Sequence, residues 1–180
     1  MCRRFSVCLE ELEDEEVYPG ITLPESYQSE PGKKAYGITF STSGVLKAYS
    51  LLFGFPSFDG KYLYNARVET AGNKPTFQED YLHHKVIFPC TSFFEVDRRK
   101  EEHEFIANNK SVIYIAGFYN REREFVLLTE SGEKYPSFSF PRMPLLLTQK
   151  DVVPYLKGEN IDKAVKPLLL DEEESQISLF

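Results

Sequence analysis

The chain of 180 residues lacks tryptophan altogether and contains only three histidines and three cysteines. It also lacks long apolar stretches, since none approaches the roughly 18 residues that a helix needs to cross a bilayer. The N-terminal arginines lead into acidic residues rather than an apolar segment, which argues against a signal peptide. These absences disfavour integral membrane and secreted proteins, and we expect a soluble, cytoplasmic monomer.

The odd number of cysteines is typical of a reducing compartment and makes a disulfide framework a poor explanation. No two of the cysteines and histidines show the C-x-x-C or H-x-x-x-H spacing of a zinc site. We therefore expect no metal and no cofactor. The residues concerned are Cys2, Cys8, Cys90, His83, His84 and His103.

The formal net charge of −7 is unevenly distributed along the chain. Two acidic runs, Glu10–Glu16 and Asp171–Glu174, contain ten of the 28 acids, so 18 acids face 21 basic residues elsewhere. The remaining body of the chain is thus slightly basic. This distribution permits a local basic groove but argues against tight, general binding to duplex DNA.

A hydrophobic content of 42% and an aromatic content of 14% indicate one packed domain. We assign residues 1–170 to this domain and residues 171–180 to an acidic C-terminal tail. About eight short strands and three short helices predict an α+β fold. The strands are drawn from the strand-like segments 2–8, 36–40, 45–53, 65–70, 85–88, 91–96, 105–107, 112–119, 124–129 and 143–147.

The helices are expected at three places. The first covers the acidic run at 10–16, and the second follows a capping box formed by Thr76 and Glu79. The third runs from Thr148, with Asp151 in a capping position, to Leu156. Proline and glycine predict a loop at 19–34, and the charged segment 97–104 predicts a solvated hairpin tip.

The stretch from Tyr64 to Thr70 places an amide, a guanidinium and a carboxylate at alternate positions. In an extended strand Asn65, Arg67 and Glu69 point to the same face. An ordinary amphipathic strand with a surface Arg–Glu pair also explains this pattern. Two other features favour chemistry: a cysteine at position 2, and Glu95 directly behind two phenylalanines.

Cys2 stands where removal of the initiator methionine exposes an α-amine beside a thiol. Such an aminothiol condenses with an aldehyde to an imine and then closes a five-membered thiazolidine. The α-amino pKa of about 7.7–8.0 leaves a neutral fraction near physiological pH. Taken alone, Cys2 is better explained as the second residue of an ordinary protein.

Four motifs together resemble the SOS response-associated peptidase (SRAP) family, the abasic-site processing proteins. They occur in the family's order and extend from residue 2 to about residue 156. The resemblance implies a largely antiparallel sheet curled into a barrel-like core with peripheral helices. The motifs are Met1-Cys2-x-Arg4-Phe5, Asn65-Ala66-Arg67-x-Glu69-Thr70, Pro89-x-x-x-Phe93-Phe94-Glu95 and Arg142-Met143-Pro144.

The resemblance implies covalent capture of abasic sites in single-stranded DNA, with the protein associated with the nucleoid when bound. Cys2 would form the crosslink, Glu95 would act as general acid and base, and Asn65 would hold the sugar or the terminal amine. A strand carboxylate in an ion pair is the alternative for Glu95, and a turn residue is the alternative for Asn65. The predicted DNA-binding residues are Arg4, Arg67, Arg142 and Phe53, with Glu69 orienting Arg67 and core packing an alternative for Phe53 and Phe55.

The sequence also departs from the family pattern. The family carries a histidine two positions before the arginine of its Arg-Met-Pro motif, where this chain has Phe140. Val96 replaces a tryptophan, and Arg3 replaces a glycine. Two alternatives therefore stay open: an N-terminal cysteine peptidase without a role on DNA, and a non-catalytic module that binds single-stranded DNA.

Overall fold

A computed structural model describes residues 2–107, 111–134, 140–159 and 169–171. Met1 and, beyond Asp171, the acidic tail expected at 171–180 lie outside the described residues. The described strands form two main sheets and two short ribbons. The ribbons pair β2 (Glu16–Tyr18) with β3 (Ile21–Thr22) and β7 (Phe55–Pro56) with β8 (Tyr62–Leu63).

The larger sheet closes on itself. Five of its strands form a ring in the order β14, β6, β5, β10, β13 and back to β14. Gly117 permits the closing approach, because a Cβ there would lie 2.6 Å from the backbone oxygen of Val126. The eight strands are β5 (Lys34–Phe40), β6 (Leu46–Phe53), β9 (Asn65–Arg67), β10 (Lys85–Cys90), β13 (Ile113–Tyr119), β14 (Glu124–Ser131), β15 (Arg142–Pro144) and β16 (Leu146–Leu147).

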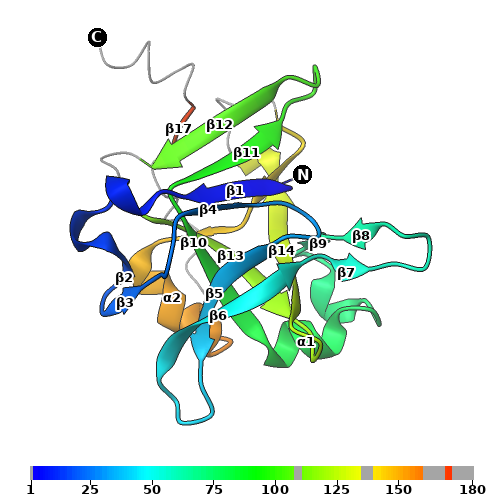
Figure 1. The fold of residues 1–180 in the computed structure, drawn as a ribbon. Helices are drawn as coiled ribbons and strands as arrows, with labels where there is room; N and C mark the ends of the chain where they lie inside the picture. The colour runs from blue at the N-terminus through cyan, green and yellow to red at the C-terminus, as the bar shows by residue number, and fades with distance from the viewer. Residues whose placement is uncertain (1, 108–110, 135–139, 160–168, 172–180) are drawn as a thin grey trace.

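The smaller sheet has five strands and lies across one end of the larger sheet (Figure 1). Its order is β17 (Leu169–Asp171), β12 (Glu102–Ala107), β11 (Ser92–Val96), β1 (Arg4–Val7) and β4 (Tyr27–Ser29). Consecutive strands β10 and β11 belong to different sheets, so the chain passes from one layer to the other at Thr91. The mixed, mostly antiparallel α+β architecture with a curled sheet confirms the predicted fold class.

An aromatic core joins the two sheets. The ring of Phe5 on β1 lies 5.8 Å from the rings of both Phe53 and Phe88, and 6.4 Å from that of Phe125. Phe53 and Phe125 stack at 4.6 Å with an interplanar angle of 5°. All four side chains are fully buried. Burial of these rings at the layer boundary is a major source of stability, because each removes a large apolar area from water.

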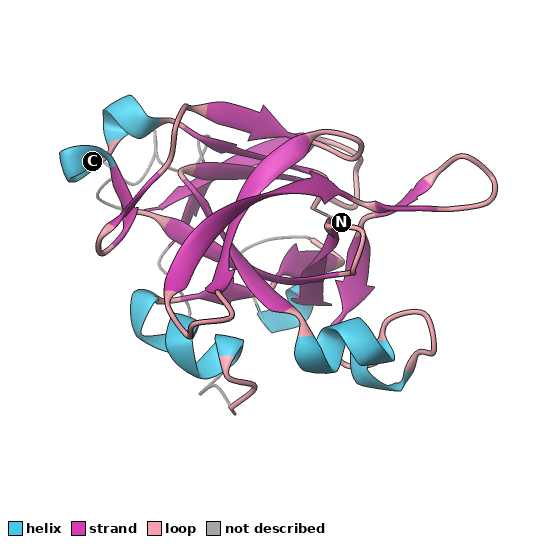
Figure 2. Cartoon of the chain, turned by 60° about the horizontal axis from the view of Figure 1, so that its bottom comes forward, coloured by secondary structure: helices cyan, strands magenta, loops and turns pink. Residues whose placement is uncertain are grey.

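Two α-helices lie at the rim of the curled sheet (Figure 2). They are α1 (Gln78–His83) and α2 (Gln149–Leu156). The predicted start of α2 is confirmed, since Asp151 accepts a hydrogen bond from the Thr148 N–H at 3.1 Å. Within the described residues, no helix has the length and apolarity that a membrane span requires.

The predicted capping box at Thr76 is wrong, because Phe77 is the residue that precedes α1 and no side chain caps it. Tertiary packing sets this boundary: Phe77 is buried against Phe55 and Phe118. The helix predicted over the acidic run is also wrong. That run forms two 3-10 turns, Leu9–Glu11 and Glu13–Glu15, and Asp14 has a left-handed φ of 56°. Clustered carboxylates repel one another at helical spacing, which disfavours a continuous helix.

Other boundaries differ from the sequence expectation. The loop predicted at 19–34 contains β3 and β4, and the tip predicted at 97–104 is shorter because β12 begins at Glu102. The strand predicted at 143–147 is divided at Leu145, whose N–H donates to Leu128 and whose carbonyl accepts from Ala116. Leu145 thereby connects β14 to β13 where these strands separate. Two further short segments are 3-10 turns, Ala71–Asn73 and Gly132–Lys134.

Phe53→Ala is expected to lower the free energy of unfolding by about 3–5 kcal/mol, because it removes a stacked ring from the closed core. Phe58→Ala is the matched control, since Phe58 is fully exposed. Its effect is expected to stay within about 0.5 kcal/mol. Urea unfolding of both variants measures the difference. Equal stabilities would show that Phe53 does not hold the two sheets together.

Candidate active site

Cys2 lies two residues before the start of β1 and is completely buried. Phe5, three residues later, anchors this end of the chain in the aromatic core. The Cys2 thiol lies 3.9 Å from the backbone oxygen of Arg4. Burial, and then the nearby groups of Glu95 and Cys90, raise the pKa of the Cys2 thiol well above its ordinary value. This thiol stays protonated at neutral pH until a neighbouring base accepts its proton.

Asn65 opens β9 and holds the N-terminal segment in place. The parallel pairing of Asn65 with Leu127 on β14 fixes its backbone. Its amide nitrogen donates to the backbone oxygens of Cys2 and Tyr64, each at 2.9 Å. Its amide oxygen is buried and accepts no hydrogen bond from the described residues. The buried amide oxygen of Asn65 is therefore available as a hydrogen-bond acceptor beside Cys2.

Glu95 is the titratable group of this site. It lies on β11, on the same inward face as Phe93, and only 1% of its surface is exposed. Burial raises the pKa of Glu95 to about 7. A carboxyl group that titrates near neutral pH both donates and accepts protons, as general acid–base catalysis requires. The structure thus brings together Cys2 from the segment before β1, Asn65 from β9 and Glu95 from β11.

His103 is a neighbour of this site that the sequence did not single out. It lies directly opposite Glu95 in the antiparallel ladder of β11 and β12. Its ring contacts Phe140 edge to face, with 5.2 Å between the ring centroids. The sequence signal was the hairpin register: strands on both sides of a turn at 97–101 place residues 95 and 103 opposite each other. Extending the solvated tip to residue 104 concealed that signal.

The predicted DNA-binding arginines have different surroundings. Arg4 stacks its guanidinium over the Phe94 ring at 3.9 Å and forms an ion pair with Glu102. Arg67 is exposed. Arg67 thus differs from Arg4 and, as shown next, from Arg142: its side chain is exposed and forms no ion pair with another described residue.

Arg142 is occupied by other contacts. It donates to both carboxylate oxygens of Glu69, at 3.0 and 2.8 Å, and to the backbone oxygen of Thr129 at 2.6 Å. The predicted partnership of Glu69 with Arg67 is therefore replaced by a partnership with Arg142. The reason is local: β9 ends at Arg67, so Glu69 lies in the following turn rather than on the expected face.

Phe53 does not offer a surface for stacking on a base. It is fully buried and stacked on Phe125. Phe55 is also buried, against Phe77 and Phe118. The core-packing alternative is the one that these contacts support.

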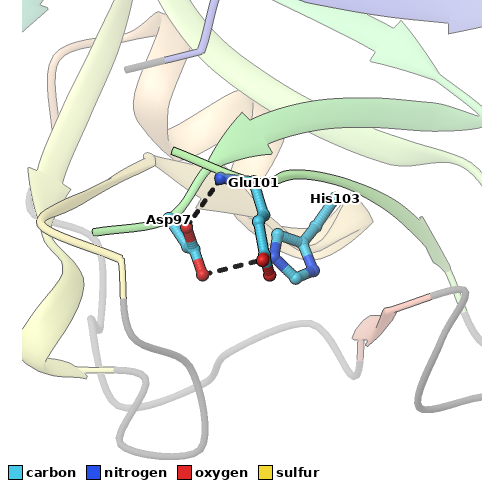
Figure 3. Close-up of side chains that lie close together, drawn as sticks. All are labelled: Asp97, Glu101 and His103. Atoms are coloured by element: carbon cyan, nitrogen blue, oxygen red, sulfur yellow. Dashed lines mark hydrogen bonds and ion pairs between the residues drawn. The ribbon is translucent and has the colours of Figure 1, made fainter. Parts of the chain in front are cut away.

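One group of side chains has the composition of a metal site (Figure 3). Donor atoms of Asp97, Glu101 and His103 lie within 4.8 Å of one another. However, one oxygen of Asp97 already accepts from the backbone N–H groups of Arg99 and Glu101, at 2.8 and 2.9 Å. Glu101 is exposed. We interpret this cluster as the hydrogen-bonded turn of the β11–β12 hairpin.

The sequence model of the family described as SOS response associated peptidase (SRAP) matches residues 1–179. No curated protein matches the sequence. A solved structure from Bordetella bronchiseptica superposes with a TM-score of 0.73 at 18% identity, covering 94% of this chain and 99% of that one.

Two further solved structures are similar. A phage-related protein from Bordetella bronchiseptica has a TM-score of 0.68 at 14% identity and covers 94% of this chain and 93% of its own. A protein from Bacteroides thetaiotaomicron has a TM-score of 0.59 at 20% identity and covers 77% and 69%. At these identities the likeness concerns the fold.

Glu95→Gln is expected to change how the stability of the fold depends on pH. With a pKa of about 7 in the folded chain against an ordinary 4.5, the folded state binds more protons between these values. The stabilising contribution is complete below pH 4.5 and is lost as the pH rises through 7, a change of roughly 3 kcal/mol. The neutral amide removes this dependence.

Urea unfolding at about pH 4 and pH 8 measures the effect. Relative to wild type, the Gln variant is expected to gain stability at the higher pH by up to that amount. Glu104→Gln, one position along β12 from His103, is the matched control. A difference between Glu95→Gln and wild type that is the same at both pH values would contradict the assignment.

Proposed function

Because the chain belongs to the SOS response associated peptidase family, we propose that it captures abasic sites in single-stranded DNA covalently through Cys2. The proposal rests on the arrangement of three side chains, those of Cys2, Glu95 and Asn65. Cys2 is buried beside Glu95, whose pKa of about 7 suits proton exchange, while Asn65 holds the Cys2 backbone at 2.9 Å. The family name, with its reference to the SOS response, supports a DNA-damage context.

The electrophile is the aldehyde of the ring-opened abasic sugar. The α-amine of Cys2 adds to the aldehyde carbon, and loss of one water gives an imine. The sulfur of Cys2 then adds to the imine carbon as the thiol proton passes to nitrogen, which closes a thiazolidine. The net change is one new C–N bond, one new C–S bond and one water released.

Glu95 serves both halves of this reaction. In its acid form it protonates the departing hydroxyl, and as a carboxylate it accepts the thiol proton. The second role matters because burial raises the pKa of the Cys2 thiol, so the sulfur needs a base in contact with it. The buried amide oxygen of Asn65 is placed to accept a hydrogen bond from the amine or from a sugar hydroxyl.

The reaction requires an unblocked amine on Cys2, and we propose that Met1 is removed to expose it. A cysteine nucleophile beside an acid–base carboxyl is also suited to cleaving the preceding peptide bond. That step agrees with the peptidase in the family's name. Peptide-bond cleavage and covalent capture are then successive uses of the same residues.

Crosslinking to a single-stranded oligonucleotide with one abasic site tests the proposal. Wild type is expected to give a heat-stable covalent band and Cys2→Ala none. Glu95→Gln is expected to form the band about 10²–10⁴-fold more slowly, because it keeps the shape but not the titratable proton. Cys8→Ala is the matched cysteine control and is expected to behave as wild type. If wild type forms no band, the chain has kept the fold and lost this chemistry.

The exposed Arg67 is expected to contribute directly to DNA affinity, whereas Arg142 is committed to Glu69 and Thr129. Each arginine–phosphate contact contributes about −0.7 to the log–log salt slope on single strands, so Arg67→Gln is expected to make the slope shallower by about 0.7. Arg142→Gln is expected to lower the free energy of unfolding by about 1–2 kcal/mol, because it removes hydrogen bonds to Glu69 and Thr129. Fluorescence anisotropy across salt concentrations measures the slopes.

The control for Arg67 is Arg121→Gln, an exposed arginine on the turn between β13 and β14. This variant is expected to keep the wild-type slope. An equal loss in both variants would mean that DNA is bound by overall charge rather than beside Cys2. Tighter binding of duplex than of single strands at every salt concentration would also contradict the proposal.

A further inference from the structure

We propose that His103 is a positioning residue that acts through Glu95, exchanging protons with it, and that Asp97 orients the imidazole. The inference rests on the proposed function, because it deepens the role of Glu95 in that reaction. It assigns a second proton-carrying group to a site where the sequence predicted none. Its basis is the geometry of the β11–β12 hairpin.

The ladder fixes the relation between His103 and Glu95. They are directly opposed partners in antiparallel strands, and side chains of such partners lie on one face with their Cβ atoms about 4.5–5.5 Å apart. The next inward pair, Phe93 and Phe105, confirms this face, since their rings stack at 5.1 Å. The imidazole thus lies beside the carboxyl group on the buried side of the sheet.

Asp97 approaches the imidazole from the turn of the β11–β12 hairpin. Its second carboxylate oxygen lies 3.5 Å from Nε2 of His103, while the first is held by two backbone N–H groups of the turn (Figure 3). Burial would raise the pKa of Asp97, but those backbone hydrogen bonds and His103 outweigh it, so the pKa is lowered. A fixed, ionised carboxylate stabilises the protonated form of an imidazole and sets its orientation.

The remaining surroundings limit the motion of the ring. Phe140 contacts the imidazole edge to face, at an interplanar angle of 89°, and also contacts Phe105. The side chain of His103 keeps 15% of its surface exposed, compared with 1% for Glu95. The imidazole is therefore placed between a buried carboxyl group and solvent, as a proton carrier must be.

The proton balance follows from this placement. When Glu95 gives its proton to the departing hydroxyl, the imidazolium of His103 returns one and takes another from solvent. When Glu95 accepts the thiol proton, the transfers run in the opposite direction. No oxidant, metal or other reactant is consumed.

The charged groups that face His103 among the described residues lie on β11 and on the turn of the β11–β12 hairpin. Glu95 belongs to β11, and Asp97 and Glu101 belong to the turn. Phe140, which reaches the ring from the segment before β15, is uncharged. The Cys2 thiol also interacts electrostatically with Glu95. The pH dependence is thus assigned to the pair of Glu95 and His103, under the influence of Asp97.

Crosslinking rates between pH 5 and pH 9 test the inference. His103→Gln is expected to form the same product about 10²-fold more slowly, and its pH profile is expected to differ in shape from that of wild type. Asp97→Asn, which keeps an acceptor for the turn amides, is expected to change the profile in the same direction by a smaller factor. Glu101→Gln and a chelator are expected to have no effect.

Superimposable profiles of His103→Gln and wild type would overturn the proposal. Loss of the wild-type rate on adding chelator, or in Glu101→Gln, would overturn it in favour of a bound divalent cation. Both results presuppose a crosslink in wild type, so a second measurement is needed that does not involve DNA.

Carboxyl ¹³C NMR of the full chain supplies this measurement. The Glu95 resonance, identified by its absence in Glu95→Gln, is expected to titrate at higher pH in His103→Gln, because a cation that favours the carboxylate is lost. Asp97→Asn gives the same test should His103→Gln not fold, and Glu101→Gln is the control. An unchanged Glu95 midpoint contradicts the pairing. If wild type forms no crosslink but the midpoint moves, the proposed function fails and the pairing stands.

Discussion

The insertion of Phe5 into the aromatic core fixes the position of the segment that carries Cys2. Its ring contacts Phe53, Phe88 and Phe125, which belong to three strands of the closed sheet. Because β1 starts at Arg4, this contact leaves Cys2 little freedom, and Asn65 removes more by binding its backbone oxygen. The first few residues of a domain are ordinarily poorly ordered unless other contacts hold them. Here the packing of one phenylalanine, three residues away, holds Cys2 in place.

Burial then sets the chemistry of the site. Water is excluded where the two sheets meet, and the charged forms of Cys2 and Glu95 are both disfavoured there, so their pKa values rise. The thiol becomes dependent on a base, and the carboxyl group becomes able to act as one near neutral pH. Burial of Glu95 therefore lowers the free energy of unfolding above pH 7, where the ionised carboxylate destabilises the folded state. Such a cost is expected where a site trades stability for reactivity.

Much of this could be predicted from local sequence. Strand-like segments indicated β5 and β6, and residue chemistry together with the family resemblance singled out Cys2, Asn65 and Glu95. The rest depends on contacts between distant segments. The partnership of Arg142 with Glu69 joins residues 73 positions apart, and the burial of Phe53 follows from closure of the sheet. The position of His103 required the register of one hairpin, which a shorter predicted turn would have given.

The central claim is that the α-amine and thiol of Cys2 together capture an abasic aldehyde. Intact-mass spectrometry of the protein, before and after incubation with an abasic single-stranded oligonucleotide, tests it most directly. The account predicts a purified chain that begins at Cys2, and an adduct whose mass is that chain plus the oligonucleotide minus one water. Met1 retained on most molecules, or an adduct that has lost no water, would contradict it.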